Sequence, residues 1–199
     1  MTSLEENTEF WSETFSGLDY SEQEIEEKEF DGCTFNECDF SETTFKRCNF
    51  VDCEFNNCNL SVARVEYSKF SDVVFNESKL VGINWTKMTM PRLALSAPIK
   101  FYKCIVNDSA FFGLGLPELV LEDCKAHRVD FREGNFSDSN FTYSDLTDCQ
   151  FAKTNLSGAD FSEATNYDID VLHNSLKGAK FTRFEAVRLL ESLEIELVD

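Results

Sequence analysis

Apolar residues recur at every fifth position along most of the chain. The series opens at Phe30, Phe35 and Phe40, continues to Leu95, slips by one residue, and resumes from Phe101 to Phe181. Of its 31 positions, 30 are apolar, and Asn166 is the exception. A period of five matches neither the 3.6 residues of a helical turn nor the two-residue alternation of a strand. The pattern therefore predicts a repeat architecture.

A second column lies two residues before the first and carries small side chains. It contains all eight cysteines of the chain, namely Cys33, Cys38, Cys48, Cys53, Cys58, Cys104, Cys124 and Cys149. The other three positions of each five-residue step are mostly Asp, Asn, Glu, Ser, Thr and Lys. One large and one small inward residue per step describe a narrow tube with a packed interior.

The two columns together resemble the motif of the pentapeptide-repeat family, which places Ala, Cys, Ser or Thr two residues before a central Leu or Phe. Cys33-Thr-Phe35, Cys53-Glu-Phe55 and Ala159-Asp-Phe161 fit it closely. The resemblance implies an all-β fold, a right-handed quadrilateral β-helix with four steps, or about 20 residues, per coil. We expect an acidic N-terminal segment with a first coil over 1–27 and the β-helix over 28–181, with an irregular break over 86–99.

The C-terminal residues 182–199 are expected to close the open end of the tube, because exposed strand edges invite uncontrolled pairing. Thr182-Arg-Phe-Glu185 has the spacing of a capping box, and an apolar helical stripe follows it. Residues 194–198 alternate like a short strand. This ending resembles the gyrase-protecting branch of the family, which includes the quinolone-resistance, albicidin-resistance and microcin-immunity proteins. The resemblance implies a tail-to-tail homodimer whose interface would use Leu189, Leu190, Leu193, Ile195 and Leu197.

The net charge of −19 is concentrated at the N-terminal end, where residues 1–31 hold eleven acids and one base. Such a balance argues against a direct nucleic-acid ligand, because phosphate binding requires clusters of Lys and Arg. The start of the chain is neither basic nor apolar, and no stretch approaches the ~20 apolar residues that span a bilayer. We therefore expect a soluble, cytoplasmic protein without a membrane partner.

The residue types that carry catalysis or bind metals do not form a recognisable motif. The five-residue spacing of the cysteines differs from the short gaps of zinc sites, so free structural thiols are favoured over disulfides or a metal. His127 and His173 are expected at solvated surface positions. No nucleophile–base order or phosphate loop can be assembled. We expect neither an enzyme nor a cofactor.

Function is therefore expected on the outer surface. With four steps per coil and a break that adds one residue, one face would be centred on Phe35, Phe55, Phe75, Leu95 and Leu116, and it would carry acids but no base. Its acids would be Glu37, Glu54, Glu77, Glu118 and Asp138. A rod with one acidic stripe resembles duplex DNA. The family resemblance implies the same mechanism, in which the rod occupies the DNA-binding saddle of DNA gyrase and protects the enzyme from a toxin or antibiotic.

The break at 86–99 supplies a second set of candidates. Loops projecting from the rods of quinolone-resistance proteins help to protect gyrase, so Lys87 and Arg92 are candidate contacts, although a local kink without function would give the same pattern. Phe112, next to Gly113, is a further candidate for a partner contact. The competing hypothesis for the whole chain is a solenoid scaffold that binds an unrelated protein.

Overall fold

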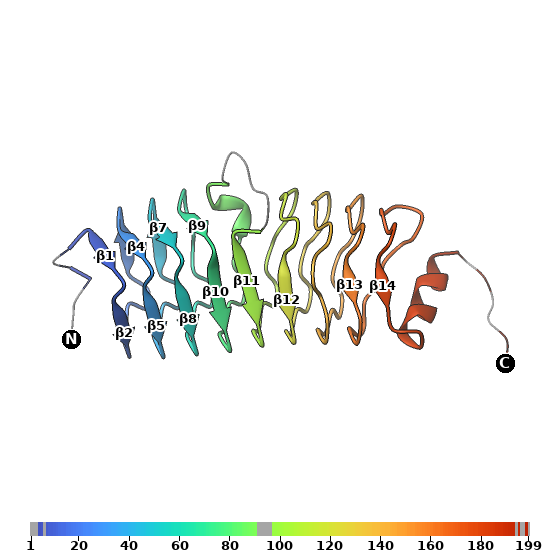
Figure 1. Cartoon of the computed structure of the whole chain (residues 1–199), viewed down its shortest axis with the longest axis horizontal. Helices are drawn as coiled ribbons and strands as arrows, with labels where there is room; N and C mark the ends of the chain where they lie inside the picture. Colours follow the sequence, from blue (N-terminus) through green and yellow to red (C-terminus); the bar gives the residue numbers. More distant parts are fainter. Residues whose placement is uncertain (1–3, 6, 91–96, 194, 196–197, 199) are drawn as a thin grey trace.

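The computed structural model is a parallel β-solenoid of about eight coils (Figure 1). It describes residues 4–5, 7–90, 97–193, 195 and 198. Strands pair in register with residues one coil ahead, so Phe10 lies beside Phe30 and Phe30 beside Phe50. The expected 20-residue coil of four five-residue steps is confirmed.

The four steps of a coil define four faces, which are numbered here in chain order. Face 1 contains β1 (Glu9–Trp11), β4 (Glu29–Asp31), β7 (Asn49–Val51) and β9 (Lys69–Ser71). Face 2 contains β2 (Thr14–Ser16), β5 (Thr34–Asn36), β8 (Glu54–Asn56), β10 (Val73–Asn76), β11 (Ile99–Tyr102), β12 (Val120–Glu122), β13 (Asp160–Phe161) and β14 (Lys180–Phe181). Face 3 is held by isolated bridges such as Asp39 to Asn59, and face 4 contains β3 (Glu24–Glu26) and β6 (Thr44–Lys46).

Stacked aromatic rings fill the interior. On face 2 the ring centroids of Phe15, Phe35, Phe55, Phe75 and Phe101 follow one another at 5.1, 4.6, 5.0 and 5.3 Å. Rings on neighbouring faces meet edge to face, which is the other favourable arrangement of two aromatic quadrupoles. The predicted large column is therefore the core of the rod.

The small column completes the backbone hydrogen bonding inside the tube. Ser144 Oγ accepts from Cys124 N at 2.9 Å and donates to Leu121 O at 2.7 Å, and Ser68 bridges Cys48 N and Phe45 O in the same way. All eight cysteines are buried and free. Burial raises the pKa of Cys53 to about 12, so its thiol stays protonated at neutral pH. These thiols act as small core residues with a weak donor.

Most corners of the coil hold a left-handed residue. At these corners the residue two positions after the central apolar residue has φ near +55°, as at Glu37, Arg47, Asp52 and Lys103. These corners place polar side chains outward at the edges between faces. Val62 is unusual among them, because a β-branched side chain disfavours φ of +60°.

The break is longer than the sequence frame implies. Val73 pairs with Ile99 and Asn84 with Ala110, so this coil has 26 residues instead of 20, and the regular register then returns. The extra residues follow a short 3₁₀ helix, η1 (Trp85–Lys87), that lies on the side of the rod (Figure 1). The expectation of a one-residue insertion was wrong. This coil contains six extra residues, which amount to one additional five-residue step plus one residue.

The C-terminus carries a 3₁₀ helix, η2 (Glu185–Leu193), against the last coil. The expected capping box is wrong. Thr182 Oγ1 accepts from Glu163 N at 2.6 Å, and Glu185 Oε1 accepts from Asn166 N at 2.8 Å, so both side chains bind the preceding coil. Arg188 adds a bond from Nε to Tyr167 O at 3.0 Å. Residues 194, 196 and 197 of the expected terminal strand lie outside the described residues.

Candidate functional site

The six-residue insertion changes which acidic residues share a face. Phe75 stacks on Phe101, so face 2 continues through Leu121 and Phe141. Leu116 and Phe136 each lie one step after a face 4 residue and so belong to face 1. A bridge between Gly115 and Asn135 joins their two steps. Glu37, Glu54 and Glu77 remain together on face 2, but Glu118 and Asp138 lie on face 1. The single five-residue acidic stripe is therefore a wrong assignment.

Face 2 also carries bases that the expected face lacked. Lys100 and Lys103 lie on the coil after the break, and Lys180 and Arg183 lie near the C-terminus. Lys100 Nζ lies 3.7 Å from Asp72 Oδ1, and Lys180 Nζ lies 3.0 Å from Asp160 Oδ2. Face 2 thus carries no cation on the coils of Phe15 to Phe75, and again none on the coils of Leu121, Phe141 and Phe161, but it is interrupted by Lys100 and Lys103 between them.

A different acidic feature follows the edge between faces 1 and 2. Asp52, Asp72, Glu118 and Asp138 all occupy the left-handed corner that ends a face 1 step. Glu54 opens the adjoining face 2 step. We call these five residues the acidic ridge. The sequence pattern did not single out Asp52 and Asp72, because it groups residues by face. The edge between two faces contains residues from both of them.

Asp52 and Asp72 lie on successive coils, about one inter-strand spacing or ~4.8 Å apart, and so do Glu118 and Asp138. The coil that contains the break separates the two pairs. Asp72 has Lys100 as an ion-pair partner. For Asp52, Glu54, Glu118 and Asp138, the part of the chain that the structure describes contains no cation within 4.0 Å. Four of the five carboxylates are therefore available to a partner.

The remaining candidates are dispersed. Lys87 is exposed at the end of η1, whereas Arg92 lies outside the described residues. Phe112 is 45% exposed and has the Arg132 guanidinium 5.8 Å from its ring centroid on face 4. These positions do not join the acidic ridge.

His127 differs from its expected solvated position. Its side chain is only 19% exposed, and Nε2 lies 2.7 Å from Asp145 Oδ2. Burial raises the pKa of Asp145, but hydrogen bonds from Thr147, Asn166 and His127 outweigh it and hold the pKa well below its usual value. Asn166 in turn binds the C-terminal helix through Glu185. This cluster connects η2 to the coils.

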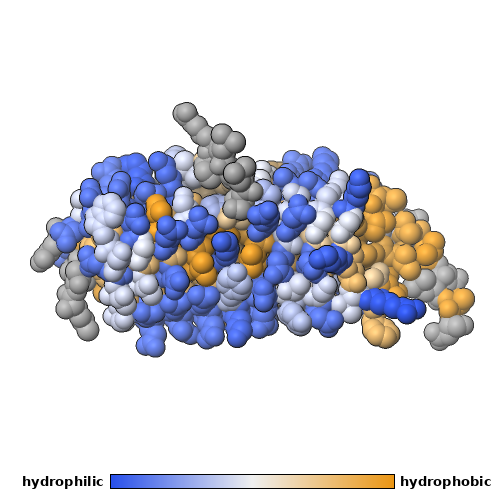
Figure 2. Space-filling view, in the orientation of Figure 1, coloured by the Kyte–Doolittle hydropathy of each residue, from blue (hydrophilic) through white to orange (hydrophobic). Residues whose placement is uncertain are grey.

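At the C-terminal end, the expected dimer residues divide into two groups. Leu189 is partly buried and packs against the core, and Leu190 is also half-buried. Leu193 and Ile195 are 38% and 52% exposed, and Leu197 lies outside the described residues. Phe184 and Val198 add exposed apolar surface, and Figure 2 shows hydrophobic residues gathered at this end of the rod.

Other chemistry is sparse over the described residues. They contain no cluster of three or more His, Cys, Asp or Glu side chains arranged to hold a metal ion. None of the helices in this part of the chain is long and apolar enough to cross a bilayer.

Comparison with known proteins identifies the class. The family profile described as a pentapeptide repeat region matches residues 28–97 and 91–161. The chain therefore belongs to the pentapeptide-repeat family.

Solved structures share its fold. A trypsin-treated variant of QnrB1, a plasmid-mediated fluoroquinolone resistance protein, is 16% identical with a TM-score of 0.64, over 93% of this chain and 100% of that one. A second QnrB1 variant is 20% identical with a TM-score of 0.54, over 96% and 92%. HetL, involved in heterocyst differentiation regulation in the cyanobacterium Nostoc sp. strain PCC 7120, is 12% identical with a TM-score of 0.65, over 85% of each chain. A search among curated protein sequences found no significant match.

Proposed function

We propose that this protein binds a type II topoisomerase, DNA gyrase in the first instance, as a mimic of duplex DNA. In this role it protects the enzyme from a gyrase-directed antibiotic or toxin and inhibits it at high concentration. The observation that carries the proposal is the acidic ridge, a line of carboxylates on a rigid rod that a surface built for DNA phosphates would attract. The fold similarity to a fluoroquinolone resistance protein supports it.

The protein itself can test the proposal in gyrase assays. We expect titrated protein to restore gyrase supercoiling in the presence of a quinolone, albicidin or a microcin, and to reduce drug-induced DNA cleavage. A protein that neither binds gyrase nor changes cleavage at any concentration would exclude this function. The fold similarity to HetL favours a second candidate, a regulatory scaffold that acts on another protein.

We further propose that two rods associate tail to tail through the exposed apolar side chains of the C-terminus. Replacing Leu193 and Ile195 together by Asp would place two charges in this contact, and we expect the sedimentation coefficient to fall to that of a monomer. Tyr143→Asp is the control, because Tyr143 is 64% exposed but lies on a coil before the C-terminal helix. A dimer that survives the double substitution would require another interface.

A further inference from the structure

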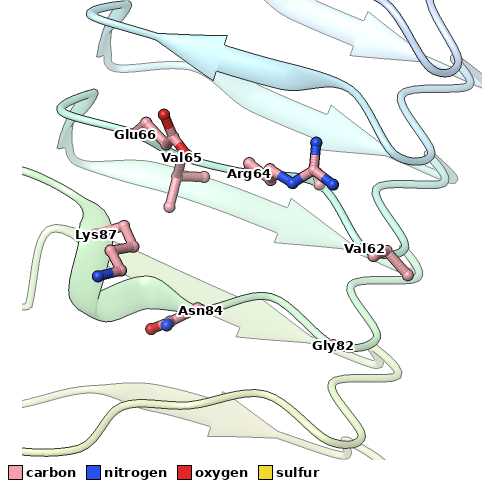
Figure 3. A pocket seen from close by; sticks show the side chains of 8 residues that line it. Val62, Arg64, Val65, Glu66, Gly82, Asn84 and Lys87 are labelled. Atoms are coloured by element: carbon pink, nitrogen blue, oxygen red, sulfur yellow. The ribbon is translucent and has the colours of Figure 1, made fainter.

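The wall of the solenoid is open at one place on face 4. Bridges join Thr44 to Arg64 above this place and Asn84 to Ala110 below it, but within the described residues Arg64 and Asn84 are not bridged. The neighbouring bonds are intact, from Val62 N to Val81 O at 2.7 Å and from Tyr67 N to Lys87 O at 3.0 Å. The two coils therefore separate locally and leave a slit of about 260 Å³ (Figure 3).

The slit follows from η1. The Asn84 carbonyl accepts from Lys87 N at 3.3 Å within the 3₁₀ turn, and the Asn84 side chain accepts from Thr86 N at 3.1 Å. In the regular ladder the same carbonyl would accept from Val65 N, as Arg64 O accepts from Phe45 N. The N–H groups of Val65 and Asn84 consequently have no hydrogen-bond partner among the residues that the structure describes.

Two cations border this opening. Neither Arg64 nor Lys87 lies within ion-pair distance of a described carboxylate, whereas Lys46, Arg47, Arg132 and Lys153 on the same face are all paired. Arg64 Nη1 has only a long contact of 3.5 Å, to Thr44 Oγ1 on the preceding coil, so its guanidinium is weakly held and directed away from the slit in this structure. The one acid in the lining, Glu66, points away from Lys87 and Asn84 in Figure 3. Cations and open N–H donors together favour a carboxylate.

The surface around the slit has the composition of a protein contact rather than of a metabolite site. Val62 and Tyr67 are 49% and 69% exposed at two of its corners, and Phe112 with Arg132 lies farther along the same face. Exposed aromatic and arginine side chains beside a pocket are enriched where proteins bind one another.

We propose that this slit is a docking site for a carboxylate side chain, Asp or Glu, on a loop of a protein partner. The carboxylate would accept from the open backbone N–H groups, and the side chains of Arg64 and Lys87, whose cationic ends point apart in Figure 3, would turn toward it from either side, while Val62 and Tyr67 contact apolar residues of the loop. This surface has the opposite charge preference to the acidic ridge. It does not rest on gyrase being the partner, so the outcome of the gyrase assays leaves it unaffected.

The test uses amide NMR with the blocked tripeptide acetyl-Leu-Asp-Leu-amide as probe and acetyl-Leu-Asn-Leu-amide as its uncharged match. We expect the Asp peptide to shift the amide signals of Val65 and Asn84 in a saturable way, and the Asn peptide to bind about tenfold more weakly or not at all. Equal shifts with both peptides, or shifts confined to other residues, would overturn the proposal.

Variants separate the site from general charge effects. Replacing Arg64 and Lys87 by Gln should lower the affinity for the Asp peptide by about tenfold. The control variant, Lys103→Gln with Lys125→Gln, removes the same charge elsewhere and should leave this affinity unchanged. Hydrogen exchange checks the slit itself. Val65 and Asn84 should exchange faster than Phe45 and Trp85, whose N–H groups donate at 2.8 and 3.0 Å. Comparable protection at all four positions would mean that the wall is closed.

Discussion

Reversing the charge of the acidic ridge should abolish binding to gyrase while the rod stays folded. The variant replaces Asp52, Asp72, Glu118 and Asp138 by Lys. Each new lysine would face a surface evolved for phosphates, and like-charge contacts of this kind cost several kcal/mol in total, or at least about a hundredfold in affinity. Lysine suits these corners, because Lys103 and Lys153 already occupy the same left-handed conformation.

A matched variant carries the same change in net charge at other edges, with Lys at Glu22, Glu42, Asp123 and Asp148. These acids are also left-handed corner residues, and the described structure gives them no ion pair. Binding to immobilised gyrase, measured at several salt concentrations, should fall steeply for the ridge variant and much less for the matched one. Equal losses would mean that overall charge and not the ridge matters, and no loss in either would favour the scaffold function.

A third variant, with Lys at Glu37, Glu54 and Glu77, compares the ridge with the stripe expected from the sequence. These three are the acids of that stripe that remain on face 2, and only Glu54 among them belongs to the acidic ridge. If the ridge is the contact, this variant should lose less affinity than the ridge variant, because two of its three changes lie away from the edge. A larger loss would place the contact on face 2.

The five-residue frame explains both what the sequence predicted and what it could not. Phe35 and Cys33 both point inward, so each step has two inward-facing apolar positions. The coil can therefore be recognised from the sequence alone. The frame, however, repeats every five residues. A break with one extra residue and a break with six extra residues leave the same apolar series in the sequence. Six extra residues, however, include one whole step that this coil absorbs, so every later residue lies one face earlier than a one-residue insertion would place it. This is why Glu118 and Asp138 were assigned to the wrong face.

Predictions from local motifs were wrong where a side chain binds the neighbouring coil instead of a residue close to it in the sequence. Thr182 and Glu185 have the spacing of a capping box, yet the last coil offers them the N–H groups of Glu163 and Asn166. Similarly, His127 occupies an outward position, but its ring packs against Asp145. Neither contact has a sequence signal, because each joins residues about one coil apart.

Truncating one central ring should have the largest effect on stability. Phe35 is 1% exposed, and its ring lies within 6.4 Å, centroid to centroid, of the rings of Phe15, Phe30, Phe40, Phe50 and Phe55. Phe35→Ala leaves a cavity inside a tube whose backbone ladder resists collapse, and it should cost about 3–5 kcal/mol. Phe184→Ala, at a position that is 89% exposed, is the control and should change stability little.

The loss should also be local, because in a solenoid each coil contacts only its neighbours. Amide hydrogen exchange should show reduced protection on the coils that carry Phe15, Phe35 and Phe55, with smaller changes beyond the break. Chemical denaturation would then show the N-terminal coils unfolding before the C-terminal ones. If protection fell equally along the whole rod, the ring stack would be one cooperative unit and the nearest-neighbour description of this core would be wrong.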